Sequence, residues 1–362
     1  MKKIIYITAV LALLIISYFL LNKQDQSKEK VLKIGAALPL TGELASFGEE
    51  FKRGAEVAQD EINGNDKIVR VIFEDTALET KKSVDAVMKL VNVDGIDALF
   101  VSAYGEAAVT HDITDRKNIP LIVLWDSNPQ LEAMGDKVFA LGPWTPASGE
   151  ITADFVYKKG MKRAAIFGYK QEWSIAVSEA FTNKFKKLGG VITTLEYANP
   201  GATDYRTEAT KIILSNPDVV YVTVEDFLKG VKQIKELGYK GVIITSDLLD
   251  NSQIELNPTL FEGVYGSQVA DPAVPEILHY IDLYKKKFGE NPKKILYSAW
   301  GYDAVHLFYK AYSDQPNKKI TEGLYKVGYK GASGEIKFDN NGTSKTIPKM
   351  FIVKNGAITK VD

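Results

Sequence analysis

Polar and aromatic residues directly follow short apolar runs that the sequence predicts to be strands, and this pattern recurs six times. The residues at these strand ends are Phe47 after the first run, then Ser102–Glu106, Trp125–Ser127, Gln171–Trp173, Glu225, and Ser246 with Asp247. Open parallel sheets bind ligands at the carboxyl ends of their strands. Hydroxyls, carboxylates and aromatic rings there could hold a small polar molecule. Singly, Ser127 could cap a helix, Asp247 could form a turn and Trp173 could pack in the interior. Their recurrence at six strand ends favours a binding site.

The sequence contains no group of residues assembled for catalysis or for metal binding. Ser333 lies in a segment that resembles the turn around a nucleophilic serine, but Glu335 stands where a second glycine is needed, so we interpret the segment as a simple turn. His111, His279 and His306 are scattered and are more typical of surface or packing histidines than of metal ligands. Neither of the usual glycine-rich nucleotide-binding motifs is present. We therefore expect no enzymatic activity, no cofactor and no metal.

The composition excludes further classes of function. The chain has 362 residues with 45 Lys and Arg, 46 Asp and Glu, and no cysteine. Residues 1–30 contain five lysines and two acidic residues, so the remaining 332 residues hold 40 basic and 44 acidic residues and a net charge of −4. This mildly acidic body does not predict nucleic-acid binding, which needs a clustered basic surplus. The absence of cysteine removes disulfides, thiolate chemistry, iron–sulfur clusters and a lipid-modified N-terminal cysteine.

From Val31 onward, strand-like and amphipathic helical patterns alternate. The predicted strands are Val31–Leu38, Ile68–Phe73, Asp97–Val101, Ile119–Leu124, Ala164–Phe167, Val191–Glu196, Val219–Val224 and Val242–Thr245. The predicted helices between and after them are Phe47–Asn63, Thr80–Val93, Ala147–Lys159, Ser174–Leu188, Phe227–Leu237, Ile277–Phe288 and Ser298–Tyr312. Most of the strands are continuous runs of Val, Ile and Leu, which is typical of strands covered on both faces by helices. The alternation predicts an α/β fold with parallel sheets.

Two such series are present, one before Leu141 and one after Ala164. The segment Leu141–Pro146 lies between them and contains two prolines, which exclude a regular element. A second change of pattern comes at Gly263–Pro275, and Gly331–Lys354 predicts short strands and turns. With 332 residues after the N-terminal stretch, the chain can bury two cores of ordinary domain size.

The N-terminus predicts a membrane-spanning helix. Ile4–Leu21 is an apolar run that as a helix would reach about 27 Å, close to the hydrocarbon thickness of a bilayer. It lacks the small-residue cleavage site of a secretory signal, so we favour a retained anchor, with a cleaved signal as the alternative. Lys2 and Lys3 favour a cytoplasmic N-terminus, which places the body outside the cytoplasm. Asn22–Lys30 is polar and charged and is interpreted as a tether.

Three motifs resemble the leucine/isoleucine/valine-binding protein family, the extracytoplasmic receptors of branched-chain amino-acid ABC importers. They are Gly35–Gly42 with Ala45 and Gly48, the segment Tyr297–Ala304, and Gly331-x-x-Gly334-x-x-x-Phe338-Asp339-x-x-Gly342. With the order of strands and helices, the resemblance covers essentially all of Val31–Asp362. It implies the type I periplasmic-binding fold, in which two Rossmann-like lobes enclose the ligand in a hinged cleft.

The resemblance also implies how the lobes divide the chain. Lobe 1 would comprise residues 31–142 and 270–345, and lobe 2 residues 143–269 and 346–362. The chain would then cross between the lobes three times. The segment with Pro143 and Pro146 and the stretch Gly266–Pro272 would be two of the hinges.

Eight ligand-binding residues follow from the resemblance. Ser127 would bridge the ligand's carboxylate and ammonium, the Trp125 carbonyl would accept from the ammonium, and Asp247 would be the counter-ion in place of the family's glutamate. Trp173 would form an aromatic lid and Phe47 would contact the ligand side chain. Gly105, beside Tyr104, stands where the family has a serine for the carboxylate, and Glu225 stands where it has a tyrosine. The carboxylate would use N–H groups of the helix that starts near Gly105. Glu225, with Asp126 next to Ser127 in sequence, favours an amino acid with a polar or cationic side chain over leucine.

These observations together predict a membrane-tethered substrate-binding protein that captures an amino acid or a related small polar ligand, such as an amide, and delivers it to an ABC permease complex. We expect a monomer that lies outside the cytoplasm, or in the periplasm or medium if the N-terminal helix is cleaved. The alternative is a sensory ectodomain coupled to a separate signalling partner, because Met1–Lys3 cannot house a signalling domain.

Overall fold

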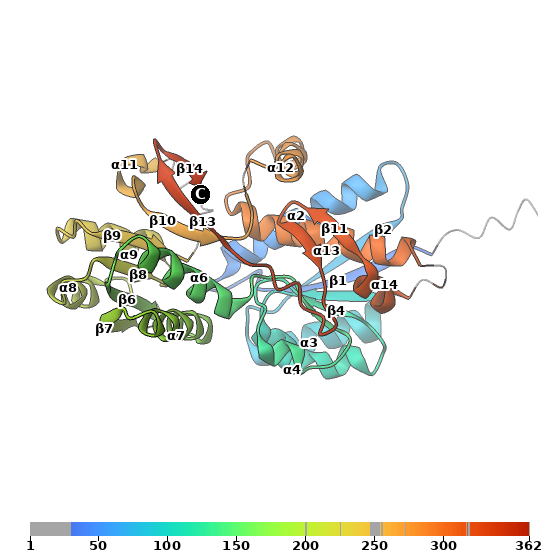
Figure 1. Ribbon diagram of the computed structural model, residues 1–362. Coiled ribbons are helices and arrows are strands. Elements are labelled where there is room, and N and C mark those ends of the chain that lie inside the picture. The colour runs from blue at the N-terminus through green and yellow to red at the C-terminus, as the bar shows by residue number, and fades with distance from the viewer. Residues whose placement is uncertain are drawn as a thin grey trace, which may run out of the picture.

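The computed structural model describes residues 30–199, 201–224, 226–246, 254, 256–271, 273–315, 317 and 319–361. The predicted membrane anchor and tether, Glu225 and Asp247 lie outside these residues. The described residues form two α/β lobes side by side (Figure 1). We use lobe 1 for the five-stranded sheet with its helices and lobe 2 for the seven-stranded sheet with its helices. Within the described residues, no helix is long and apolar enough to cross a membrane.

Lobe 1 is built on a fully parallel sheet with the strand order β2-β1-β3-β4-β5. Its strands are β1 (Leu32–Leu38), β2 (Val69–Asp75), β3 (Ala98–Val101), β4 (Leu121–Val123) and β5 (Val138–Ala140). Apolar residues of β1 are buried on both faces, because Ile34 joins the core on one side of the sheet and Ala37 the core on the other. This two-sided burial explains the continuous apolar runs of the sequence.

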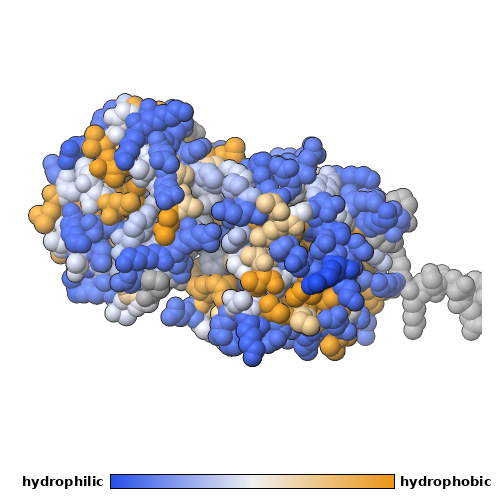
Figure 2. All heavy atoms as spheres, turned by 90° about the horizontal axis from the view of Figure 1, so that it is seen from below, coloured by the Kyte–Doolittle hydropathy of each residue, from blue (hydrophilic) through white to orange (hydrophobic). Residues whose placement is uncertain are grey.

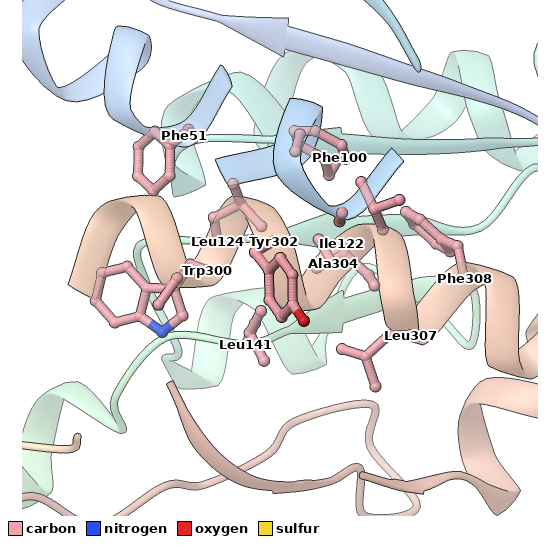
Figure 3. Packing of buried hydrophobic residues seen from close by; sticks show 14 of the residues in the cluster. Phe51, Phe100, Ile122, Leu124, Leu141, Trp300, Tyr302, Ala304, Leu307 and Phe308 are labelled. Atoms are coloured by element: carbon pink, nitrogen blue, oxygen red, sulfur yellow. The ribbon is translucent and has the colours of Figure 1, made fainter. Parts of the chain in front are cut away.

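Helices cover both faces of the lobe 1 sheet. They are α2 (Ala45–Asn63), α3 (Thr80–Lys89), which continues into a short π-helix at Leu90–Asp94, α4 (Tyr104–Asp115), α5 (Pro129–Glu132), α12 (Pro275–Phe288), α13 (Ile295–Ser313) and α14 (Ile320–Lys326). A hairpin, β11 (Gly328–Gly331) and β12 (Gly334–Lys337), completes the lobe. Figure 3 shows the core between α2, α13 and the sheet, with Phe51 and Trp300 towards one end and Phe308 towards the other.

Lobe 2 is built on a mixed sheet with the order β14-β13-β10-β9-β8-β6-β7. Its strands are β6 (Arg163–Tyr169), β7 (Val191–Ala198), β8 (Val219–Val222), β9 (Val242–Thr245), β10 (Tyr265–Gln268), β13 (Lys349–Lys354) and β14 (Ala357–Lys360). The helices are α6 (Thr145–Lys158), α7 (Glu172–Lys187), α8 (Arg206–Leu214), α9 (Phe227–Glu236) and α11 (Pro258–Phe261). Strands β6 to β10 pair in parallel, while β13 runs antiparallel to β10. Helices α6 and α7 cover one face, and α8, α9 and α11 the other.

The chain passes between the two sheets three times, after β5, after β10 and after β12. The first and third connections run side by side, since Ala140 pairs with Thr343 and Pro143 with Thr346 in isolated bridges. Figure 1 shows the third connection as a single extended segment that enters β13. In Figure 2 the two lobes form rounded masses with a narrower junction, and polar residues cover most of that face.

The predicted fold class, an α/β protein with two sheets of mainly parallel strands, is confirmed. The eight predicted strands and seven predicted helices are present, with ends displaced by up to about four residues. The sequence analysis missed the strands β5, β10 and β14 and the helices α4, α5, α8, α11 and α14. Strand β7 lies at the sheet edge and is half exposed, unlike the buried strand that its apolar residues suggested.

Two glycines let α2 and α13 approach closely. A Cβ atom on Gly54 would lie 1.7 Å from the Ser298 carbonyl oxygen, and one on Gly301 would lie 2.0 Å from the Phe51 carbonyl oxygen. These contacts join backbone to backbone, so no side-chain rotation can relieve them. The two glycines therefore set the distance between α13 and α2.

Gly54→Ala is expected to destabilise the fold by about 3 kcal/mol, because overpacking forces two helices apart. The matched control is Gly105→Ala, where no heavy atom lies within 4 Å of the new Cβ and stability should stay the same or rise slightly. Urea unfolding of both variants measures the difference. Equal midpoints would contradict this account of the α2–α13 contact.

Candidate ligand-binding cleft

A cavity of about 470 Å³ lies at the carboxyl ends of the strands of both sheets. This volume is within the range of small-molecule pockets. Lobe 1 contributes residues from the start of α2, the loops after β3 and β4, and the start of α13. Lobe 2 contributes residues from the loops after β6, β8 and β9 and from β10. The principal lining residues are Phe47, Ala103, Trp125, Asp126, Tyr169, Gln171, Trp173, Ser174, Thr223, Asp226, Ser246, Gln268, Lys294, Tyr297 and Trp300.

The lobe 1 wall is aromatic. Phe47 and Trp125 stack with ring centroids 5.2 Å apart, and Tyr297 meets the two rings edge-on at 4.8 and 5.5 Å. Phe51 and Trp300 pack behind this group, and both are buried in the lobe 1 core (Figure 3). The Nζ atom of Lys294 lies 4.4 Å from the centroid of the Phe47 ring. The wall is therefore a firm apolar surface that already carries one cation on a ring face.

The lobe 2 wall presents hydroxyl groups. Ser174, in the first turn of α7, accepts a hydrogen bond from the Tyr169 N–H at 2.9 Å and shares one with the Thr223 hydroxyl at 2.8 Å. Asp226 caps α9 by accepting from the Lys229 N–H at 3.0 Å. The Asp226 carboxylate also pairs with the Lys229 Nζ at 3.0 Å. These bonds fix the strand-end loops of lobe 2 without involving a side chain of lobe 1.

Two carboxylates occupy the donors at the end of β3. The Tyr104 N–H, at the first residue of α4, donates to Asp126 at 2.8 Å. Glu106 accepts from the N–H groups of Ser102 and Ala103 at 2.8 and 3.1 Å. Three successive backbone donors that could have bound an anion are thus bound by side chains of the protein itself.

Both carboxylates are held in a desolvated environment. Burial raises the pKa of Asp126 to about 6, an effect that the Tyr104 hydrogen bond opposes and the charge of Glu172 reinforces. Burial likewise raises the pKa of Glu106, and hydrogen bonds from Ser102 and Thr76 oppose that effect. Asp126 lines the cleft, whereas Glu106 is covered beneath it. Of these two acidic side chains, half-buried Asp126 is therefore the one that a ligand in the cleft can contact.

Two buried oxygen atoms near the junction of the lobes have no hydrogen-bond partner among the residues that the structure describes. They are Oγ of Ser127, which is fully buried, and Oε1 of Gln268, whose residue is 3% exposed and lines the cleft. Buried polar atoms are nearly always paired in folded proteins. Gln268 thus offers an acceptor that a ligand in the cleft can satisfy.

The structure places the predicted site residues in three groups. Phe47, Trp125 and Trp173 line the cleft together. Tyr104, Gly105 and Ser127 belong to the same loops but are not part of the lining; Gly105 is exposed and Ser127 is buried behind Trp125 and Asp126. Glu225 and Asp247 lie outside the described residues.

Sequence reasoning missed several lining residues, among them Ser174, Thr223, Gln268, Lys294 and Tyr297. A signal existed for two of them. Thr223 sits within the last residues of a predicted strand, and Tyr297 opens one of the three motifs that carry the family resemblance. Gln268 and Lys294 follow no strand that the sequence pattern predicted, so strand-end reasoning could not reach them.

Comparisons with known proteins agree with the geometry. The family model described as periplasmic binding protein matches residues 31–356, and the chain belongs to this family. The Leu/Ile/Val-binding protein homolog 3 of Brucella melitensis is 29% identical over 233 residues, which are 61% of this chain and 62% of that protein.

Two solved structures show the same fold. The leucine-binding protein LivK of Thermotoga maritima superposes with a TM-score of 0.78 at 26% identity and covers 92% of this chain and 98% of its own. LivJ of Streptococcus pneumoniae, a branched-chain amino-acid transporter substrate-binding protein solved with isoleucine, superposes with a TM-score of 0.81 at 23% identity and covers 91% and 98%. The chain has the type I periplasmic-binding fold, and the expected family is confirmed.

Asp126→Asn is expected to stabilise the protein in the absence of ligand at pH 7.5, by at most about 3 kcal/mol. Because the pKa of Asp126 is raised in the folded state, its charge lowers the free energy of unfolding by the full amount above about pH 6. This destabilisation shrinks as the pH falls and disappears below the ordinary pKa of 3.8. Asparagine keeps an acceptor for the Tyr104 N–H and removes the charge. Urea unfolding of the parent protein and of Asp126→Asn at pH 7.5 and 4.5 measures the difference in their free energies of unfolding. A variant that is less stable by the same amount at both pH values would contradict the desolvation of Asp126.

Proposed function

We propose that the protein is an extracytoplasmic substrate-binding protein that captures an amino acid or a related small polar ligand between its lobes and delivers it to an ABC importer. The observation that carries this proposal is the cavity of about 470 Å³ at the facing strand ends of two sheets, with an aromatic wall on one side and a hydroxyl-lined wall on the other. The membership of the periplasmic binding protein family supports it. In this role the protein binds and releases its ligand without converting it, and needs no cofactor.

The ligand contacts follow from the family resemblance together with the cleft. Phe47 and Trp125 offer ring surface to an apolar part of the ligand, and Trp173 closes over it from lobe 2. The Trp125 carbonyl accepts from an ammonium group, with Asp247 as counter-ion and Glu225 near the side chain. The Ser127 hydroxyl is buried outside the cleft lining and would have to turn into the cleft to take part. The family resemblance alone would place a ligand carboxylate towards Tyr104 and Gly105. A closed cleft removes water, so each charge of the ligand needs such a partner.

Binding and lobe closure are coupled through the first connection. The Ser127 carbonyl accepts from the Thr145 N–H at 2.9 Å, so the loop after β4 is attached to the start of α6 in lobe 2. A Cβ atom on Gly142 would lie 2.4 Å from the Trp125 carbonyl oxygen, which places the connection directly against the ligand-binding loop. Closure would then be a hinge motion of residues 31–142 with 270–345 against residues 143–269 with 346–362.

The same proposal places the protein outside the cytoplasm as a monomer, held to the membrane by Ile4–Leu21 or released if that segment is cleaved. Its partner in transport would be an ABC permease complex. Co-purification of the full chain with the permease encoded beside it, in membranes rather than in the soluble fraction, tests both parts. Recovery with a sensor kinase instead would favour the sensory role.

Thermal unfolding with each of the twenty amino acids and their decarboxylated amines tests ligand capture. A ligand present at one hundred times its dissociation constant should stabilise the protein by about 3 kcal/mol. If no compound raises the melting temperature of the folded protein, the proposal that the ligand is an amino acid or its amine is wrong.

Phe47→Ala should weaken binding of the stabilising compound at least tenfold, because it removes one ring of the aromatic wall. Phe288→Ala is the matched control, since that ring is similarly half-buried in lobe 1 but contacts Arg53 and lies outside the cleft lining. Titration calorimetry of the two variants gives the comparison. Equal affinities in both would contradict the location of the site.

A further inference from the structure

The head of α4 is already neutralised by the protein's own carboxylates. A helix N-terminus offers free N–H groups and a partial positive charge, which make it a natural site for a ligand's carboxylate. Here the Ser102 and Ala103 N–H groups donate to Glu106 and the Tyr104 N–H donates to Asp126. Gly105, the next residue, is exposed and does not line the cleft. A ligand carboxylate at this place would meet Asp126 instead of free donors.

The charge of Asp126 faces the cleft without a basic partner. Among the described residues, its one hydrogen bond comes from the Tyr104 N–H, and the charged group that acts on it is another acid, Glu172, at the start of α7 in lobe 2. The two acids therefore act on each other from opposite lobes. An unpaired carboxylate in a desolvated site is costly, and a ligand that brings a positive charge relieves that cost.

The other cleft-lining charges among the described residues differ from Asp126. Asp226 is paired with Lys229 at 3.0 Å. Lys294 lies over the Phe47 ring, at the aromatic wall. Asp126 is thus the cleft carboxylate that has no ammonium or guanidinium beside it within the described part of the chain.

The surroundings also favour a donor of hydrogen bonds. Gln268 lines the cleft with a buried Oε1 acceptor that has no partner among the described residues and needs an N–H or O–H group. The rings of Trp125 and Trp173 line the cleft, and aromatic rings attract cations. An organic cation with several N–H groups would satisfy all three features: the buried Gln268 acceptor, the Asp126 carboxylate and the aromatic rings.

We propose that the ligand is a small organic cation, an amine, amidine or guanidine, whose positive group binds at Asp126, and that no ligand carboxylate is held at the head of α4. This proposal rests on the proposed function and names the class of ligand within it. The family resemblance implied a ligand carboxylate at the start of α4, whereas this proposal places a positively charged group there.

Matched pairs of ligands test the class. The pairs are arginine with agmatine, lysine with cadaverine, and leucine with 3-methylbutylamine, each titrated calorimetrically into the full chain. The expected result is that at least one amine binds as tightly as its amino acid or more tightly. If amino acids bind and every amine binds more than tenfold more weakly, this proposal is overturned while the proposed function stands. If no member of any pair binds, this proposal is overturned, and the proposed function is decided separately by the thermal survey of all twenty amino acids.

Asp126→Asn tests the position. It keeps the acceptor for the Tyr104 N–H and should weaken binding of the preferred cation at least thirtyfold. Asp226→Asn is the control in the same cleft, and because its charge is already paired the loss should be less than fivefold. Thermal unfolding confirms that both variants are folded. Equal losses in the two variants, or unchanged affinity in Asp126→Asn, would overturn the assignment to Asp126.

Discussion

The direction of the strands is the constraint on which the binding cleft depends. In both lobes the strands around the cleft are parallel, so every loop that follows a strand emerges at the same edge of its sheet. The two edges face each other, and the loops after β3, β4, β6, β8 and β9 meet at one cavity. The close packing of α2 against α13 holds the aromatic wall behind this cavity. The fold thereby brings together at least eight regions of the chain, four from each lobe.

The three connections between the lobes determine how one lobe can move relative to the other. The first and third connections run side by side and pair through isolated bridges at Ala140 and Pro143, while the second leaves β10 independently. The loop after β4 contacts the first connection at Ser127 and Trp125. Movement of this loop when a ligand binds would therefore act directly on the segment about which the lobes would move. The desolvated Asp126 belongs to this same loop, so the group that we propose to bind a ligand's charge also lies beside the proposed hinge.

Sequence reasoning reached the fold and part of the site for identifiable physical reasons. Continuous Val, Ile and Leu runs mark strands buried on both faces, and Gly160, Gly189, Gly238 and Gly289 all adopt the positive φ of a helix end. Phe47, Trp125 and Trp173 were found because they follow such strands. Gln268 and Lys294 were not, because β10 (Tyr265–Gln268) has no run of Val, Ile or Leu and Lys294 reaches the cleft through the packing of α13 on α2. The role of Asp126 depends on the Tyr104 hydrogen bond, and only the structure shows that contact.

The distance between the lobes is the most direct test of a receptor that closes on its ligand. The chain has no cysteine, so Lys81→Cys in α3 and Lys186→Cys in α7, both at exposed positions, give one spin label on each lobe without background. Pulsed electron paramagnetic resonance then measures the separation of the labels with and without the compound that binds most tightly in calorimetry. The account predicts a shorter and narrower distance distribution when the cleft is saturated, and no change with a compound that does not bind. An unchanged distribution at saturation would contradict closure between the lobes.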